Sequence, residues 1–195
     1  MHQQFASDLE LITGYQNGNE QCLHHLIRRY ETKIFTAIVI QVKDKSLAED
    51  LFQETFFKII NTLRAGQYKE EGKFLAWAIR IAHNLAIDHF RKESRMPKTR
   101  DTEDYSIMNS LKFTDENVEQ LFSKNQTHQQ LRKLIELLPH EQREVIIMRH
   151  FGEMSFKEIA ECTKVSINTA LGRMRYALIN LRKLIKEKQL VLTDR

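Results

Sequence analysis

Residues 134–184 carry the strongest structural constraint in the sequence: their pattern predicts three short helices followed by a long basic helix. Ser155 and Glu158 stand three residues apart in the pattern of a capping box, which satisfies backbone N–H groups at the start of a helix. A turn at residues 163–165 follows, and Ser166 is a preferred N-cap residue for the next helix. This spacing predicts a helix-turn-helix, in which the second helix enters the major groove of DNA.

The positions that would face base edges and phosphates lie at the start of this second helix. They are Ser166, Asn168, Thr169, Arg173, Arg175 and Tyr176. The charge distribution agrees with a polyanionic partner, because residues 128–195 hold 13 Lys and Arg against eight Asp and Glu while the whole chain has a net charge of only +4. The positive excess therefore lies in the half with the helix-turn-helix. The alternative is a basic face that serves only solubility.

The fold class predicted from periodicity is all-α. Apolar residues recur at intervals of three and four, and Ser/Glu pairs mark helix starts at Ser7 and Ser46. These signals predict four helices before residue 93, at about residues 8–16, 20–41, 46–63 and 73–92. Residues 94–127 are polar and of mixed charge, which is typical of a flexible linker. We therefore expect two small helical domains, residues 1–93 and 128–195, joined by this linker.

One face of the fourth predicted helix combines aromatic, basic and amide side chains. This stripe contains Trp77, Arg80, Asn84, Asp88 and Arg91, and it follows a loop containing Tyr68, Lys69 and Lys73. Aromatic rings beside positive charge suit single-stranded DNA, whose unstacked bases need a flat partner and whose backbone is anionic. The alternative is that Trp77 packs beneath the loop and the charged groups are only solvated.

The third predicted helix has a core stripe and a second, amphiphilic face. The core stripe holds Leu51, Phe52, Thr55, Phe56, Ile59 and Leu63, whereas the second face holds Asp50, Gln53, Glu54, Phe57 and Lys58. An exposed phenylalanine beside acids and an amide indicates a surface for a protein partner. A plain solvent-exposed face is the alternative interpretation.

Three segments together resemble the bacterial RNA polymerase sigma factors of the small extracytoplasmic-function group. They are AEDLFQETFFKI (48–59), FLAWAIRIAHNLAIDHFRK (74–92) and LPHEQREVIIMRHFGEMSFKEIAECTKVSINTALGRMRYA (138–177). The resemblance covers both domains and their order. It implies that the first segment docks on the clamp helices of core polymerase and that the second reads the melted minus-ten element. It also implies that the C-terminal domain binds the flap of the core and the minus-thirty-five element.

Carried over by position, the resemblance assigns a role to individual residues. The core-docking positions are Asp50, Leu51, Gln53, Glu54 and Lys58. The positions expected to contact melted DNA are Tyr68, Lys73, Phe74, Trp77, Arg80, His83, Asn84 and Arg91. His83 stands where related chains often have arginine, and Leu171 and Gly172 stand where they often have a basic residue and a serine. Leu171 and Gly172 lower the polarity of the groove-contacting surface, so we expect an unusual or weak readout of duplex sequence. His83 can still stack on a base or donate to a phosphate, with less charge than an arginine.

The sequence gives no support for an enzyme. It has no Gly-rich phosphate loop and no nucleophile elbow, and its histidines lack metal-ligand spacing. We therefore assign no catalytic residue, metal or cofactor. Cys22 and Cys162 have no CxxC partner and are expected to be reduced. Without a secretion signal or a bilayer-spanning stretch, a cytoplasmic location without membrane insertion is expected.

The expected function is promoter recognition as an initiation factor for core RNA polymerase. Its expected partners are the polymerase core and promoter DNA, the free protein is expected to be a monomer, and the existence of an anti-sigma factor is left open. The main alternative is a stand-alone dimeric helix-turn-helix regulator, which leaves the aromatic and basic stripe around Trp77 unexplained. An adaptor that binds only proteins is a third interpretation, and it predicts no contact with DNA.

Overall fold

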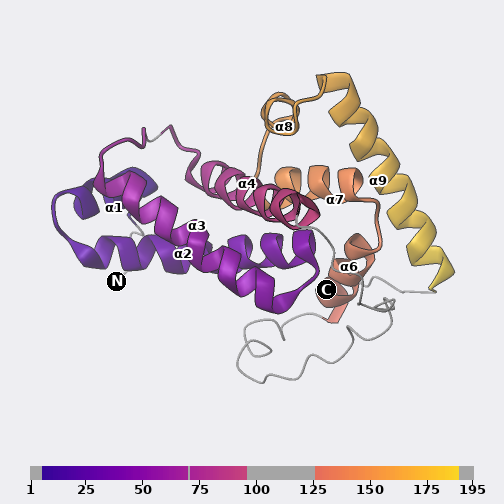
Figure 1. Cartoon of the computed structure of the whole chain (residues 1–195), viewed down its shortest axis with the longest axis horizontal. Helices are drawn as coiled ribbons and strands as arrows, with labels where there is room; N and C mark the ends of the chain where they lie inside the picture. The colour runs from indigo at the N-terminus through magenta and orange to yellow at the C-terminus, as the bar shows by residue number, and fades with distance from the viewer. Residues whose placement is uncertain (1–5, 70, 96–125, 189–195) are drawn as a thin grey trace.

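The computed structural model contains helices and turns, and no strand, over the residues it describes, which are 6–69, 71–95 and 126–188 (Figure 1). The N-terminal group comprises α1 (Asp8–Gln16), α2 (Glu20–Val42), α3 (Lys45–Arg64) and α4 (Phe74–Arg95). The C-terminal group comprises α6 (Gln126–Glu136), α7 (His140–Ile146), the π-helix η1 (Ile147–Phe151), α8 (Phe156–Thr163) and α9 (Ile167–Glu187). The all-α prediction is confirmed, and most of the predicted linker lies outside the described residues.

Local side-chain chemistry sets several helix starts. Ser7 accepts a hydrogen bond from the backbone N–H of Glu10 at 3.2 Å, and Glu10 accepts one from the backbone N–H of Ser7 at 2.6 Å. Ser155 and Glu158 form the same capping box at α8. Both predicted boxes are therefore confirmed, and each satisfies donors that the first helical turn leaves open.

The predicted capping box of Ser46 and Glu49 is wrong. Helix α3 begins at Lys45, and its N-cap is Asp44, whose Oδ1 accepts from the backbone N–H of Leu47 at 2.9 Å. An aspartate is as good a cap as a serine, and its negative charge also suits the positive end of the helix dipole. The helix therefore starts before Ser46.

The N-terminal group buries most of the apolar residues that the sequence places on one face of each helix, although Phe52 of the predicted α3 stripe is only partly buried. In α3 the buried stripe contains Leu51, Thr55, Phe56, Ile59 and Leu63, and in α4 it contains Leu75, Ala78, Ile79, Ala82, Leu85 and Ala86. These stripes pack against α2 and against each other. Burial of large aliphatic side chains at about 1.5–3 kcal/mol each is the main stabilising contribution.

The C-terminal group confirms the helix-turn-helix. Helices α7 and α8 pack against α9, where the small side chains of Ala170 and Ala177 are fully buried. Lys164 ends α8 in the left-handed conformation, with φ at 55°, and Ser166 then caps α9 by accepting from the backbone N–H of Thr169. The π-helix η1 between α7 and α8 is not predicted by the sequence.

The two groups pack directly on each other, a contact that the sequence does not predict. Figure 1 shows α7 next to α4, and the C-terminal elements α6, α7 and η1 contact α2 or α4. Gly152, directly after η1, lies against Ile79 of α4. No helix in the described ranges is long and apolar enough to span a membrane.

We expect Gly152→Ala to destabilise the protein by about 1–3 kcal/mol, because the added Cβ would overpack a closed contact. It would lie 2.8 Å from the Met148 carbonyl oxygen and 3.3 Å from Ile79 Cγ2. Gly172→Ala is the matched control, because a Cβ there meets nothing within 4 Å. In the interior of α9 this change should stabilise by about 0.5–1 kcal/mol. Urea unfolding measures both, and equal stability of the two variants would contradict the close packing at Gly152.

Candidate nucleic-acid interface

Three aromatic rings cluster at the start of α4. The Tyr68 and Trp77 rings lie 4.3 Å apart between centroids, and both pack on Phe74, at 6.0 Å and 5.8 Å. Tyr68 and Trp77 are half-buried, whereas Phe74 is 1% exposed and also contacts the ring of Tyr30. The outer rings of Tyr68 and Trp77 can therefore offer a surface to a base. Phe74, predicted to contact DNA, instead lies in the core beneath them because it is the first buried residue of α4.

The basic and amide residues of α4 fall into two groups. Asn84 and Arg91 are exposed, and Arg91 is only 3.9 Å from Asp88 in a loose ion pair. Lys73, Arg80 and His83 instead face the C-terminal group. Lys73 Nζ lies 2.7 Å from Glu158 Oε1, and Arg80 is half-buried beside Cys162, with its Nε lacking a hydrogen-bond partner. His83 is only 5% exposed, so its predicted contact with DNA requires the two groups to move apart.

A buried network joins His83 to α2, α7 and α9. Gln41 Nε2 is 2.9 Å from His83 Nδ1, His83 Nε2 is 3.2 Å from Glu144 Oε1, and Glu144 Oε2 is 3.5 Å from Arg173. An amide N–H₂ can only donate, so His83 Nδ1 acts as the acceptor and its ring proton sits on Nε2. That proton points at Glu144. If His83 were doubly protonated, its Nδ1–H would face the N–H₂ of Gln41, so two donors would meet with no acceptor between them.

Burial determines the protonation of this network. It lowers the pKa of His83 to about 4, with a smaller effect from the nearby His140. Burial also raises the pKa of Glu144 to about 7, and the positive charge of Arg173 opposes that rise. At neutral pH, His83 is therefore uncharged. It donates a hydrogen bond to the Glu144 carboxyl group, whose pKa lies close to neutral pH.

The start of α9 presents the residues predicted to contact duplex DNA. Asn168, Arg175 and Tyr176 are exposed, and the Tyr176 side chain reaches 62% exposure. Ser166 and Thr169 are exposed but hydrogen-bond each other through their hydroxyls at 2.8 Å as part of the cap. Arg173 is half-buried through its contact with Glu144. The start of α9 therefore offers two kinds of contact group: exposed polar side chains, and the Arg173 guanidinium, which is paired with the Glu144 carboxylate.

The second face of α3 is exposed as the sequence predicts. Asp50, Gln53, Glu54 and Lys58 are exposed, and Phe57 among them is 65% exposed. Leu51, assigned to the same docking positions, is 4% exposed and belongs to the core stripe. Phe57 stands on the predicted face but was not among the residues carried over from the resemblance. Its exposure makes it the largest apolar group of this surface.

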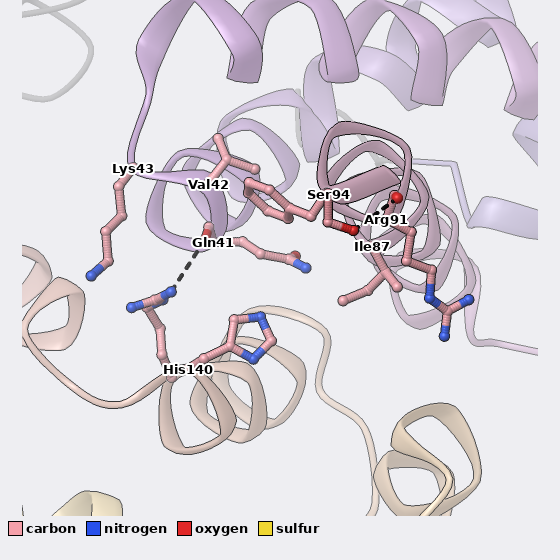
Figure 2. A pocket seen from close by; sticks show the side chains of 9 residues that line it. Gln41, Val42, Lys43, Ile87, Arg91, Ser94 and His140 are labelled. Atoms are coloured by element: carbon pink, nitrogen blue, oxygen red, sulfur yellow. Dashed lines mark hydrogen bonds between the residues drawn. The ribbon is translucent and has the colours of Figure 1, made fainter. Parts of the chain in front are cut away.

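An open cleft of about 630 Å³ lies between the two groups, where the ends of α2 and α4 meet the start of α7 (Figure 2). Its basic residues are Lys43, Arg91, His140 and Arg143. Arg143 donates to the carbonyl oxygens of Leu138 at 3.1 Å and Gln41 at 3.4 Å. Burial and the charge of Arg143 lower the pKa values of Lys43 and His140. Sequence reasoning missed this cleft because its residues come from three distant segments.

The described residues bring together no group of three His, Cys, Asp or Glu side chains that could hold a metal ion. The polar clusters above contain hydrogen-bond donors, positive charge and aromatic rings. These are the groups that contact phosphates and bases.

Two family models match the chain. The model described as Sigma-70 region 2 matches residues 19–96, and the model described as Sigma-70, region 4 matches residues 128–176. The first match contains α2, α3 and α4, and the second contains the helix-turn-helix and the first turns of α9. Both exposed surfaces and the aromatic cluster therefore lie within matched segments.

Curated relatives align along most of the chain. The RNA polymerase sigma-H factor of Pseudomonas aeruginosa is 28% identical over 172 residues, which cover 86% of this chain and 88% of the relative. The ECF RNA polymerase sigma-E factor of Haemophilus influenzae is 23% identical over 187 residues, covering 93% and 95%. The sigma-E factor of Escherichia coli K12 is 26% identical over 182 residues, covering 89% and 93%.

Two solved structures share the fold. One is CnrH in complex with the cytosolic domain of CnrY, with a TM-score of 0.59 and 20% identity, covering 93% of this chain and 99% of that one. The other is the sigma factor RpoE bound to the anti-sigma factor NepR from Bartonella quintana. Its TM-score is 0.61 with 20% identity, covering 84% of this chain and 96% of that one.

We expect acid to weaken the contact between the two groups through Glu158. Hydrogen bonds from Lys73 and from Ser155 lower the pKa of Glu158 to about 2, from an ordinary value of 4.5. Because the folded-state pKa is depressed, the contribution of the carboxylate to stability is complete above about pH 4.5 and is lost as the pH falls toward 2. The apparent melting temperature of the wild type should therefore fall more steeply between pH 5 and pH 3 than that of Glu158→Gln.

Lys73→Gln is the matched control for this titration. It removes the largest cause of the pKa shift but keeps the cap bonds from Ser155. The melting temperature of Lys73→Gln should fall between pH 5 and pH 3 by less than that of the wild type and by more than that of Glu158→Gln. Parallel curves for the wild type and Glu158→Gln would contradict the depressed pKa.

Proposed function

The chain belongs to the extracytoplasmic-function group of RNA polymerase sigma factors, and we propose that it directs core polymerase to promoters through three separate surfaces. The observation that carries this proposal is the pairing of region 2 and region 4 segments in one chain, each with exposed recognition groups. The protein binds core polymerase and promoter DNA, acts in the cytoplasm and performs no bond chemistry itself.

The α4 surface captures bases of the melted minus-ten element. Tyr68 and Trp77 offer half-buried rings held from below by Phe74, and Asn84 offers an exposed amide with both a donor and an acceptor. Arg91 extends positive charge along the same helix. Stacking and backbone attraction together are the usual basis for holding single-stranded DNA.

The exposed face of α3 docks on the polymerase. Phe57 is an apolar anchor surrounded by Asp50, Gln53, Glu54 and Lys58, which form a polar rim. A large apolar side chain inside a polar rim is the typical anatomy of a protein–protein interface. Leu51 supports this face from the core.

The first turns of α9 read the minus-thirty-five element as duplex. Asn168, Arg175 and Tyr176 are exposed for contacts with bases and phosphates, and Arg173 lies beside them. Leu171 is 43% exposed and Gly172 carries no side chain, so the middle of this surface has few polar groups. Duplex recognition then depends on positions at its edges and on phosphate contacts.

A protein antagonist is a further proposed partner. The related RpoE structure contains the anti-sigma factor NepR, and this chain shares its fold over 84% of its length. We propose that an anti-sigma factor of this general kind binds the present chain. Pull-down with the isolated chain as bait, followed by competition with core polymerase, tests that assignment.

The function is tested by transcription with core polymerase on fragmented genomic DNA. Mapped transcript starts should share two sequence elements, at the spacing of a minus-ten and a minus-thirty-five element. A stand-alone dimeric regulator would instead behave as a dimer in gel filtration and bind palindromic DNA without polymerase. A protein-only adaptor would bind no DNA even with polymerase present.

We expect promoter melting to require core polymerase. Opening about six base-pair steps costs roughly 8 kcal/mol at ~1.4 kcal/mol per step, whereas each captured base returns only ~1–3 kcal/mol. Permanganate footprinting on a mapped promoter should therefore detect unpaired thymines only when both proteins are present. Reactive thymines with the isolated chain alone would refute this energetic argument.

We also expect substitutions on the α3 surface and on the α4 surface to impair different steps: binding to core polymerase and open-complex formation. Phe57→Ala should weaken binding to core polymerase at least about tenfold, because it removes the anchor of the interface. Leu9→Ala is the matched control, since Leu9 is also a large exposed apolar residue, at 57%, and lies on α1. The double variant Gln53→Ala/Glu54→Ala should also lose core affinity with unchanged circular dichroism.

Asn84→Ala should show the opposite behaviour. Its core affinity should match the wild type, while open-complex formation should fall because a base edge loses its amide partner. Asn84 is exposed, so the melting temperature should not change. Loss of core affinity in Asn84→Ala, or normal core affinity in Phe57→Ala, would contradict this division.

A further inference from the structure

The basic cleft between the two helical groups is not used by the three surfaces of the proposed function, apart from Arg91. Figure 2 shows Lys43 on one side of this cleft and His140 of α7 on the other. The cleft volume of about 630 Å³ lies within the range of sites that hold cofactor-sized molecules. Among the described residues that line it, none is an aspartate or a glutamate. The cleft is therefore a candidate site for an anion.

Three side chains of the cleft are of the types that carry positive charge at neutral pH: Lys43, Arg91 and Arg143. Carboxylates outside the lining balance this charge only in part. Glu136 acts on Lys43, but burial and the charge of Arg143 still lower the pKa of that ammonium group below its ordinary value. Asp88 lies 3.9 Å from Arg91 in a loose pair whose side chains are both exposed. The cleft therefore keeps an excess of positive charge that an anion would neutralise.

Two donors in the cleft are free to contact a ligand. Within the part of the chain that the structure describes, neither the Lys43 ammonium group nor the His140 ring makes a hydrogen bond or an ion pair, and both residues are exposed. Arg143 differs, because its guanidinium donates to the carbonyl oxygens of Leu138 and Gln41. Arg143 thus links α7 to the end of α2 and adds positive charge, while Lys43 and His140 supply the free N–H groups.

The remaining wall of the cleft is apolar and includes an aromatic ring. Val42 at the end of α2 and Ile87 and Phe90 of α4 form this wall. Val42 is buried, and Ile87 and Phe90 are half-buried. An aromatic ring gives a flat base a stacking partner, and positive charge attracts phosphate. A phosphate group and a flat ring joined in one small molecule make a nucleotide. A diphosphate suits this cleft better than a single carboxylate does, because its charge is spread over enough oxygen atoms to meet several cationic groups.

We propose that the cleft binds a small soluble nucleotide of the nucleoside diphosphate class, with its phosphates at Lys43 and His140 and its base against Phe90. Arg143 attracts the phosphates while it keeps its carbonyl partners. The ligand contacts the N-terminal group through Lys43 and Phe90 and the C-terminal group through His140. A DNA strand also presents phosphate beside a ring, but the DNA-binding surfaces proposed above include neither Lys43 nor His140. The site requires no polymerase or promoter, so the isolated chain is sufficient to test it.

Lys43→Gln is the main variant, and Lys164→Gln is its matched control. Both lysines are exposed, and each ends a helix in the left-handed conformation, with φ at 60° for Lys43 and 55° for Lys164. The two changes therefore remove the same charge at the same kind of backbone position. Lys164 ends α8 and does not line the cleft. His140→Ala removes the free ring from the opposite wall, and Phe90→Leu keeps an apolar side chain but removes the aromatic ring.

Isothermal titration calorimetry of the full-length chain measures binding of adenosine diphosphate and guanosine diphosphate, with inorganic pyrophosphate as the probe that lacks a base. At least one nucleoside diphosphate should saturate a single site with a dissociation constant below about 1 mM. Lys43→Gln and His140→Ala should each weaken this binding at least about threefold, because each removes a donor to phosphate. Lys164→Gln should bind like the wild type. Phe90→Leu should weaken the nucleoside diphosphate about fivefold and pyrophosphate by less than about twofold, since only the former has a base to stack.

Three results would overturn the proposal. The first is a lack of saturable binding for both nucleoside diphosphates at about 1 mM. The second is an equal loss of affinity in Lys43→Gln and Lys164→Gln, which would indicate attraction to a basic surface in general. The third comes from anisotropy with a labelled pool of randomised single-stranded 20-mers. If Lys43→Gln weakens binding to these strands more than binding to the nucleotides, the cleft belongs to the path of DNA. Lys43 and His140 are exposed, so the melting temperatures of their variants without ligand should match that of the wild type.

Discussion

Helix α4 must satisfy neighbours on two sides, and the arrangement of the other helices follows from this constraint. One face places Leu75, Ala78 and Ala82 in the N-terminal core, which fixes the helix against α2 and α3. The opposite side carries the basic groups that face the C-terminal elements. Ile79 takes part in both contacts, since it is buried in the core and touches Gly152. Part of the recognition surface proposed for the N-terminal group is thus also its interface with the remainder of the chain.

Features that depend on local chemistry could be predicted from the sequence. Helix periodicity, two capping boxes and the cap at Ser166 need only residues within a few positions of each other, and the structure contains all of them. The exposure of Phe57 was predictable for the same reason, because it lies opposite the core stripe of its own helix. The error at Ser46 arose where two adequate caps, Asp44 and Ser46, compete two residues apart.

Features that depend on contacts between distant residues could not be predicted. The resemblance placed Phe74 and His83 with the DNA-contacting residues, but sequence spacing does not reveal that one supports an aromatic cluster and the other meets Glu144, 61 positions later. The basic cleft likewise assembles Lys43, which follows α2, with Arg91 of α4 and Arg143 of α7. Residue type and helical face indicate what a side chain can contact, whereas tertiary packing determines which partner it has.

The histidine at position 83 is chemically suited to a buried position between the two helical groups. An arginine at this position would remain charged at any physiological pH, and burying it would require an anionic partner held in good geometry. Neutral His83 enters the interior without a charge, and Gln41 fixes its proton on Nε2 so that it donates to Glu144. The low pKa of His83 is a consequence of this burial, which disfavours the charged form of the ring. A histidine here therefore lowers the cost of packing the two groups together, compared with the arginine that related chains often have, because it enters the interior uncharged.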